Sequence, residues 1–145
     1  MPTPSPAGSA NAGSVRPADV LVLDSGGFSR LSSRTRPALA MLRALHANDL
    51  WPPVVPTMVL VESLHRHAAR DANASRFLKT CIIEASVLPA VARRAAELRR
   101  RARAGSAVDA LVVALAEPGG TVLTGDRADL EMLAAHADGV AVEVV

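Results

Sequence analysis

Short runs of apolar residues alternate with longer Ala- and Leu-rich segments, and this alternation constrains the fold more than any other feature of the sequence. The run at 18–23, Ala-Asp-Val-Leu-Val-Leu, is typical of a strand buried on both faces. Further strands are expected at 54–55, 82–87, 121–124 and 140–145, and helices at 37–47, 57–69, 75–79, 89–104, 107–116 and 128–137. This order predicts a three-layer α/β/α fold with a central parallel sheet.

Turn and cap residues mark the boundaries of these segments. The stretch 24–27, Asp-Ser-Gly-Gly, predicts a turn after the first strand. Thr57 and Ser106 are each expected to cap the helix that follows them, and Gly105 is expected to end the Arg-rich helix before it.

A chain of 145 residues predicts one domain. Residues 1–18 are rich in Pro, Ala, Gly and Ser and are expected to form a disordered tail, with the folded domain at 19–145. No apolar run approaches the roughly 18 residues of a membrane helix, and no signal-peptide pattern is present. We therefore expect no membrane association and a cytoplasmic protein.

Cysteine and aromatic content narrow the chemistry. The single cysteine, Cys81, cannot form an internal disulfide and is expected to be a small buried hydrophobe. With one Trp, two Phe and no Tyr, the core must be aliphatic. Base recognition by a row of stacked aromatic side chains is not expected.

Basic residues are unevenly distributed, although the formal net charge is only +2. Six of them crowd one short segment: Arg93, Arg94, Arg99, Arg100, Arg101 and Arg103. A solvated helix face and a surface that binds phosphates or an acidic partner both explain this run. The sequence does not decide between them.

Four acidic residues fall where a parallel sheet places ligands, beyond the carboxyl ends of its strands. Asp24 directly follows the first strand, and Asp126 follows the strand at 121–124 after one intervening residue. Glu62 and Asp109 lie in the first halves of two helices and have apolar neighbours. We expect these four carboxylates to converge on one edge of the sheet.

Each acid also has a purely structural explanation. Ser106 and Asp109 have capping-box spacing, Asp126 and Asp129 fit the start of a helix, and Asp24 fits a turn. Helix caps and turns alone, however, would not require the four carboxylates to meet at one edge of the sheet. Clustered carboxylates repel one another, and a hard cation such as Mg²⁺ or Mn²⁺ relieves that repulsion and activates water for phosphodiester hydrolysis.

Four segments, in this order, resemble the PIN-domain nucleases and more narrowly the VapC toxins of bacterial toxin–antitoxin pairs. They are Leu23-Asp24-Ser25, Val61-Glu62-Ser63-Leu64, Val108-Asp109-Ala110-Leu111-Val112-Val113-Ala114 and Leu123-Thr124-Gly125-Asp126-Arg127-Ala128-Asp129-Leu130. The resemblance implies a parallel sheet of about five strands. It also implies an endoribonuclease that requires Mg²⁺ or Mn²⁺, forms homodimers and is inhibited by a cognate antitoxin encoded nearby.

Carried over residue by residue, the resemblance makes Asp24 and Asp109 the principal metal ligands. Glu62 and Asp126 match the other two acids of the quartet, with Asp126 a further ligand. Thr124 matches a hydroxyl that orients the site, and Asp129 and Ser25 are candidate supporting residues. The pair Gly26-Gly27 departs from the family pattern and is expected to loosen the first turn beside the metal.

Other functions fit less well. An aspartyl phosphatase would need a second Asp at position 26, which is Gly, and a receiver domain would need an acidic pair and a C-terminal Lys. The serious alternative is a catalytically inactive PIN-like protein that binds RNA or a partner. His65 and His67 are expected to be exposed on one helix, and Phe28 and Leu31 to belong to the core or to accept the antitoxin.

Overall fold

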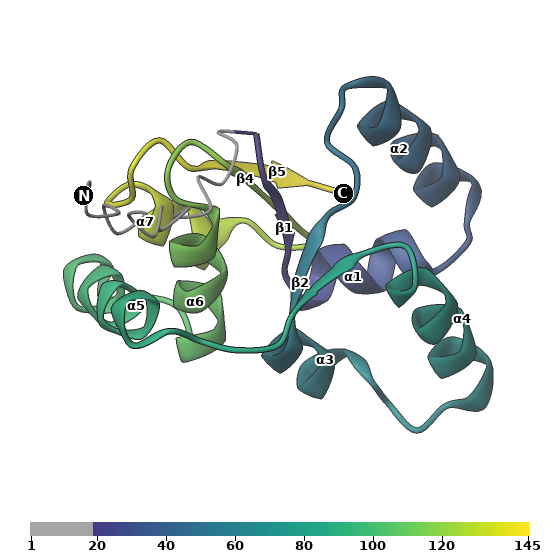
Figure 1. Cartoon of the computed structure of the whole chain (residues 1–145), viewed down its shortest axis with the longest axis horizontal. Coiled ribbons are helices and arrows are strands. Elements are labelled where there is room, and N and C mark those ends of the chain that lie inside the picture. The colour runs from purple at the N-terminus through teal and green to yellow at the C-terminus, as the bar shows by residue number, and fades with distance from the viewer. Residues whose placement is uncertain (1–18) are drawn as a thin grey trace, which may run out of the picture.

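The computed structural model describes residues 19–145, so the predicted N-terminal tail lies outside the described residues. Five strands form one all-parallel sheet in the order β3-β2-β1-β4-β5 (Figure 1). They are β1 (Leu21–Leu23), β2 (Val54–Pro56), β3 (Ile82–Glu84), β4 (Thr121–Thr124) and β5 (Ala141–Val144). The predicted parallel sheet is confirmed.

Helices cover both faces of this sheet. They are α1 (Ser25–Ser32), α2 (Arg36–Ala47), α3 (Thr57–Ser63), α4 (Ala68–Leu78), α5 (Pro89–Ala102), α6 (Ala107–Ala116) and α7 (Ala128–Ala134). In Figure 1, α5, α6 and α7 lie on one side of the sheet and α1 to α4 on the other. The predicted three-layer α/β/α architecture is therefore confirmed.

The core is built around the central strand β1. All three of its residues are buried, and Val22 pairs with Val54 of β2 and with Val122 of β4. Branched aliphatic side chains pack well on a sheet that is covered on both faces. On the α1 side the aromatic residues join this core, because the Phe77 ring lies 5.6 Å from that of Phe28 and 5.9 Å from that of Trp51. The core is otherwise aliphatic, as predicted.

Helix α1 was not predicted from the sequence, which indicated only a turn at 24–27. Asp24 directly follows β1 and is the N-cap residue of α1. Its Oδ1 accepts a 2.6 Å hydrogen bond from the Gly27 N–H. A Cβ atom at Gly27 would lie 2.2 Å from the carbonyl oxygen of Leu123. Glycine disfavours a helix but permits this close approach of α1 to β4. The glycine pair thus accompanies a formed, tightly packed first turn, and the expectation of a loosened one is wrong.

The predicted helix at 57–69 ends six residues early, at Ser63, and an extended linker follows it. The short helix predicted at 75–79 is part of a longer one, α4, which begins at Ala68. Helix α3 ends at Ser63, because Leu64 adopts extended backbone angles. Thr57 does not cap α3 as predicted; its hydroxyl instead donates a 2.9 Å hydrogen bond to the Glu84 carbonyl of β3. His65 and His67 therefore lie in the linker and at the cap of α4 rather than on one helix, although both are exposed as expected.

Boundaries elsewhere differ from the predictions by a few residues. Ser106 caps α6, as predicted, and α5 ends with Arg103 in the left-handed region, two residues before Gly105. The edge strand β3 and helix α7 are three residues shorter than expected. Within residues 19–145, no helix combines the length and apolar character needed to cross a membrane.

Candidate functional site

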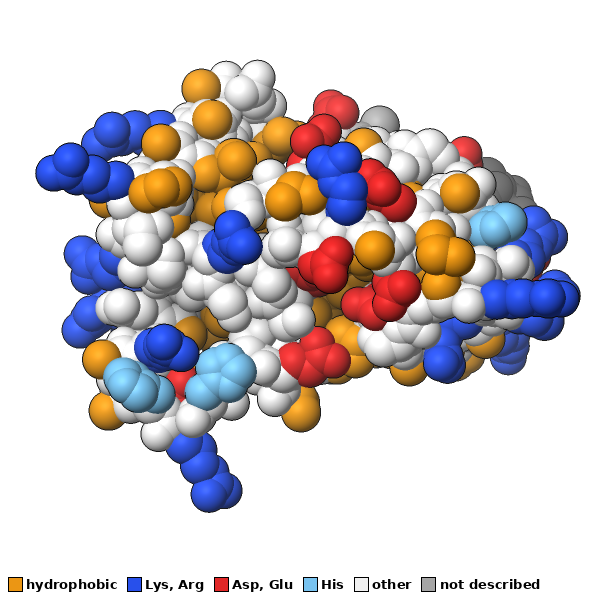
Figure 2. Space-filling view, turned by 180° about the vertical axis from the view of Figure 1, so that it is seen from behind, with side chains coloured by type: hydrophobic (Ala, Val, Ile, Leu, Met, Phe, Trp, Pro, Cys, Tyr) orange, Lys and Arg blue, Asp and Glu red, His pale blue; other side chains and the backbone are white. Residues whose placement is uncertain are grey.

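An open pocket of about 410 Å³ lies at the carboxyl ends of β1 and β4. The starts of α1 and α6 and the loop from β4 to α7 supply its walls. Its lining includes four acids and two hydroxyl residues predicted from the sequence: Asp24, Asp109, Asp126, Asp129, Ser25 and Thr124. Acidic side chains gather in the middle of the face shown in Figure 2, around a hollow. Residues up to 105 positions apart in the chain thus meet at one sheet edge, as the topology predicts.

Asp24 is the most constrained acid of this pocket. Only 8% of its surface is exposed, and both carboxylate oxygens accept hydrogen bonds, Oδ1 from Gly27 N–H and Oδ2 from the Thr124 hydroxyl at 2.5 Å. Burial raises the pKa of the Asp24 carboxyl above its ordinary value, and the charge of Asp109 raises it further. The two hydrogen bonds lower the pKa but only partly offset the burial.

Thr124 is fully buried, and its hydroxyl forms hydrogen bonds with Asp24, which follows β1, and with Asp126, which follows β4. Its oxygen accepts a 3.0 Å hydrogen bond from Asp126 N–H and lies 2.8 Å from the Asp126 carbonyl. The single hydroxyl proton has one principal acceptor, and the charged Asp24 carboxylate is the stronger one. Thr124 therefore links the orientation of Asp24 to the backbone of the loop that carries Asp126.

Asp109 forms the predicted capping box at the start of α6. Its Oδ2 accepts a 2.8 Å hydrogen bond from Ser106 N–H, and its own N–H donates to the Ser106 hydroxyl at 3.1 Å. The structural explanation for this acid is confirmed. Its carboxylate nevertheless lines the acidic pocket and is close enough to raise the pKa of Asp24.

Asp126 and Asp129 form the exposed rim of the pocket. The Oδ1 of Asp126 accepts a 3.2 Å hydrogen bond from Ala128 N–H, so this side chain orders the start of α7. The expected cap is not formed, however, because the N-cap residue of α7 is Arg127, whose side chain makes no cap hydrogen bond. Asp129 lies in the first turn of α7, where a negative charge is favourable.

Glu62 does not join the other acids. It is exposed on α3 and does not line the acidic pocket, and its neighbour Val61 is 82% exposed. Glu62 has apolar neighbours in the sequence, but of Val59, Val61 and Leu64 only Val59 is buried, so Glu62 does not border a buried face. Three of the four expected acids therefore meet at one pocket.

The donor chemistry of the pocket suits a hard divalent cation, since it offers carboxylate and hydroxyl oxygens beside open solvent. As the side chains lie, no group of three or more His, Cys, Asp or Glu within residues 19–145 is arranged to hold a metal ion. Asp109 and Asp126 each direct one carboxylate oxygen to a backbone N–H group, of Ser106 and Ala128 respectively. The other carboxylate oxygen of each residue, Asp109 Oδ1 and Asp126 Oδ2, accepts no hydrogen bond within residues 19–145.

Two features of the structure involve four of the six arginines in the Arg-rich segment. Arg94 is a structural residue: its guanidinium donates to both oxygens of Glu117 at 2.8 and 2.7 Å and to Glu97 at 3.1 Å. Glu117 lies 23 positions away and was missed by the sequence analysis, because nothing local indicates the pair. Three other arginines line an open hollow at the end of α5: Arg99, Arg100 and Arg103.

Arg30 was also missed, because α1 was not predicted. Its Nη1 donates a 2.7 Å hydrogen bond to the Val145 carbonyl, and its Nε lies beside Gly125 in the wall of the acidic pocket.

No family model and no curated protein matches the chain. The likeness to PIN-domain nucleases therefore rests on the short segments quoted above.

Proposed function

We propose that this protein is an endoribonuclease that requires Mg²⁺ or Mn²⁺ and acts as the toxin of a VapC-like toxin–antitoxin pair. The observation that carries the proposal is the pocket in which Asp24, Asp109 and Asp126 meet, with Asp24 held by Thr124. A parallel sheet with acids beyond its carboxyl edge suits phosphate chemistry that needs a cation. A cognate antitoxin, a homodimer and a cytoplasmic location complete the proposal.

In this proposal the three aspartates would hold the cation, which supplies a Lewis acid and lowers the pKa of water. Thr124 and Gly27 keep both oxygens of Asp24 in a fixed orientation, which limits the reorganisation that binding requires. Hydrolysis forms one bond from a water oxygen to phosphorus and breaks the bond to the leaving oxygen, which takes up a proton. Because Glu62 lies outside the pocket, the proposal rests on three aspartates.

The competing proposal is a catalytically inactive PIN-like protein that binds RNA or a partner. The hydrogen bonds that Asp109 and Asp126 accept from backbone N–H groups favour it, because they give these carboxylates structural roles. Metal binding separates the two proposals, since only the nuclease needs a cation in the acidic pocket.

The deciding experiment incubates the purified full chain and RNA with Mg²⁺ or Mn²⁺ and follows cleavage. Asp24→Asn and Asp109→Asn should each abolish cleavage, and EDTA should abolish it in the unchanged protein. Asp49→Asn is the matched control, since it removes one exposed carboxylate from the loop before β2. Thermal unfolding checks that each variant folds. Cleavage that survives both site substitutions would refute the assignment, and folded protein that binds RNA without cleaving it would favour the competing proposal.

The toxin role has its own test. Expression of the chain should halt bacterial growth, and co-expression of the product of the adjacent gene should restore it. Asp24→Asn should remove the toxicity without preventing that product from binding. Harmless expression of an active nuclease would refute the toxin role and leave the nuclease proposal intact.

A further inference from the structure

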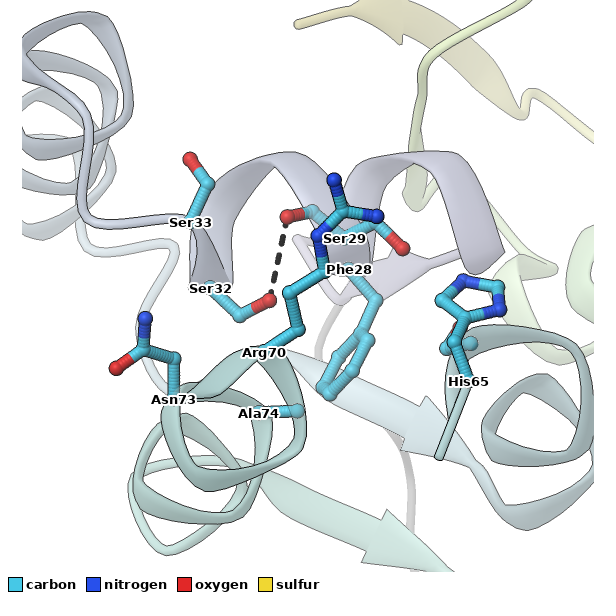
Figure 3. Close-up of a pocket in the computed structure, with 9 residues that line it drawn as sticks. Phe28, Ser29, Ser32, Ser33, His65, Arg70, Asn73 and Ala74 are labelled. Atoms are coloured by element: carbon cyan, nitrogen blue, oxygen red, sulfur yellow. Dashed lines mark hydrogen bonds between the residues drawn. The ribbon is translucent and has the colours of Figure 1, made fainter. Parts of the chain in front are cut away.

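A second pocket, of about 300 Å³, opens between α1 and α4 and has no role in the site described above. Its floor is apolar and includes Phe28 and Ala74, while its rim is polar (Figure 3). The rim includes Ser29, Ser33, His65, Arg70 and Asn73. No acidic residue lines it, in contrast to the pocket at the strand ends.

Arg70 is the cation of this second pocket. Figure 3 shows its side chain rising from α4 across the pocket toward Ser29 of α1. The guanidinium makes no hydrogen bond or ion pair with any residue of 19–145, and only its backbone N–H is engaged, by His67. The neighbouring acid, Asp71, accepts a hydrogen bond from the His65 N–H. The five N–H donors of Arg70 are therefore available to an anion.

Serine hydroxyls give the pocket a second kind of polar group. Ser32, Ser33 and Ser63 already donate to the backbone carbonyls of Ser29, Arg30 and Val59, at 3.2, 2.6 and 2.8 Å respectively. Their hydroxyl protons are committed, and the Ser33 oxygen also lies 3.2 Å from the Thr35 hydroxyl. The oxygens of Ser32 and Ser63 can therefore act as acceptors toward a ligand that donates. A ribose 2′-hydroxyl is such a donor, and a deoxyribose lacks it.

The two pockets share helix α1. Ser25 and Gly26 at its first turn line the acidic pocket, and Ser29 lines the second pocket one turn later. A rise of 1.5 Å per residue separates Ser25 and Ser29 by about 6 Å along the helix axis. In Figure 2, Arg, Lys and His side chains lie on both sides of the central acidic side chains, including the side where α1 to α4 lie. One polynucleotide strand can therefore reach both pockets.

A cationic contact outside the acidic pocket favours the binding of a nucleic-acid strand. Carboxylates repel the phosphates of a nucleic acid, and affinity for a strand comes mainly from phosphates neutralised by Arg or Lys. We propose that the pocket between α1 and α4 binds a phosphate–ribose unit of single-stranded RNA, with Arg70 on the phosphate and the serine oxygens on the ribose hydroxyl. This inference rests on the proposed function, because it identifies the strand that crosses the acidic pocket.

Binding is tested on the full chain in EDTA, so that no cleavage occurs, with a short fluorescent single-stranded RNA as the probe. Arg70→Gln should weaken binding about tenfold at low salt, a loss typical of one charge-assisted contact. It should also flatten the slope of log K against log salt by about 0.7. Arg43→Gln is the matched control, since it removes one exposed charge from α2 and lines neither pocket. DNA of the same sequence should bind more weakly than the RNA.

Equal losses for Arg70→Gln and Arg43→Gln would overturn the proposal, because net charge alone would then explain the binding. Equal affinity for RNA and DNA would overturn the ribose contact. Cleavage in Mg²⁺ is measured separately. Arg70-dependent RNA binding without any cleavage would refute the proposed nuclease and support this pocket. Cleavage with a KM unchanged by Arg70→Gln would refute the pocket and leave the nuclease standing.

Discussion

The Thr124 hydroxyl donates a hydrogen bond to Asp24 Oδ2 across 2.5 Å and so joins the end of β4 to the residue that follows β1. The other oxygen of this carboxylate, Oδ1, accepts a hydrogen bond from Gly27 N–H in the first turn of α1. The carboxylate is thus fixed by a strand on one side and a helix on the other. The fold itself therefore sets the orientation of this buried acid.

Removal of the Thr124 hydroxyl should destabilise the fold and disturb the site. Thr124→Val keeps the shape but leaves the buried Asp24 oxygen without a donor, at a cost of about 1–3 kcal/mol in unfolding free energy. The pKa of Asp24 should rise further, because a bond that lowers it is lost. Urea denaturation measures the stability. Thr121→Val on the same strand is the control; an equal loss there would contradict a special role for Thr124.

Glycine at position 27 should be required for α1 to pack. A Cβ there would lie 2.2 Å from the Leu123 carbonyl oxygen, so Gly27→Ala must push α1 away from β4. We expect a loss of about 3 kcal/mol or more in unfolding free energy, as for other overpacked sites. Gly125→Ala is the control, because its Cβ would meet nothing nearer than 3.4 Å. Similar stability of both variants would show that α1 can move freely.

The ion pair between Arg94 and Glu117 should make stability depend on pH. Arg94 lowers the pKa of Glu117, whose side chain is only 14% exposed. The stabilisation is therefore full above the pKa of an unfolded Glu, about 4.3, and is lost as the pH falls through the lower folded value. Glu117→Gln should cost about 2 kcal/mol near neutral pH and much less below that range.

The control for this pair is Glu131→Gln. Glu131 meets Arg127 at 3.4 Å, and both side chains are at least half exposed, so water screens the interaction. Its effect on stability should be small at every pH. Denaturation curves at neutral and acidic pH compare the two variants, and a pH-independent loss in Glu117→Gln would contradict the linkage.

The cation should stabilise the folded protein through the acidic pocket. Because burial and Asp109 raise the pKa of Asp24, its charged form is disfavoured in the fold, and a bound cation relieves that penalty. A cation at a hundred times its dissociation constant adds about 2.7 kcal/mol to the unfolding free energy. Mg²⁺ or Mn²⁺ should therefore raise Tm, and Asp24→Asn should abolish the rise. An identical rise in both proteins would place the cation elsewhere.

The sequence predicted those features of the fold that depend on residues close together in the chain. The apolar runs located all five strands, and Ser106 with Asp109 located the start of α6. Long-range contacts decided the rest. Helix α1 contains two glycines that disfavour a helix, and it forms because Asp24 caps it and β4 lies against it. The second pocket was not predicted either, because α1 and α4 line it jointly and neither was assigned correctly.

Glu62 provides the sharpest comparison between the resemblance and the geometry. The resemblance assigns it to the acid quartet, whereas the structure places it on exposed α3, outside the pocket of Asp24, Asp109 and Asp126. If Glu62 stays outside the pocket when RNA and metal bind, Glu62→Gln should change kcat less than about twofold, while Asp24→Asn abolishes cleavage. Loss of cleavage in Glu62→Gln, with Tm and RNA binding unchanged, would instead show that α3 shifts toward the pocket when RNA and metal bind. That result would restore a four-acid site and make the closure of α3 a step in the reaction.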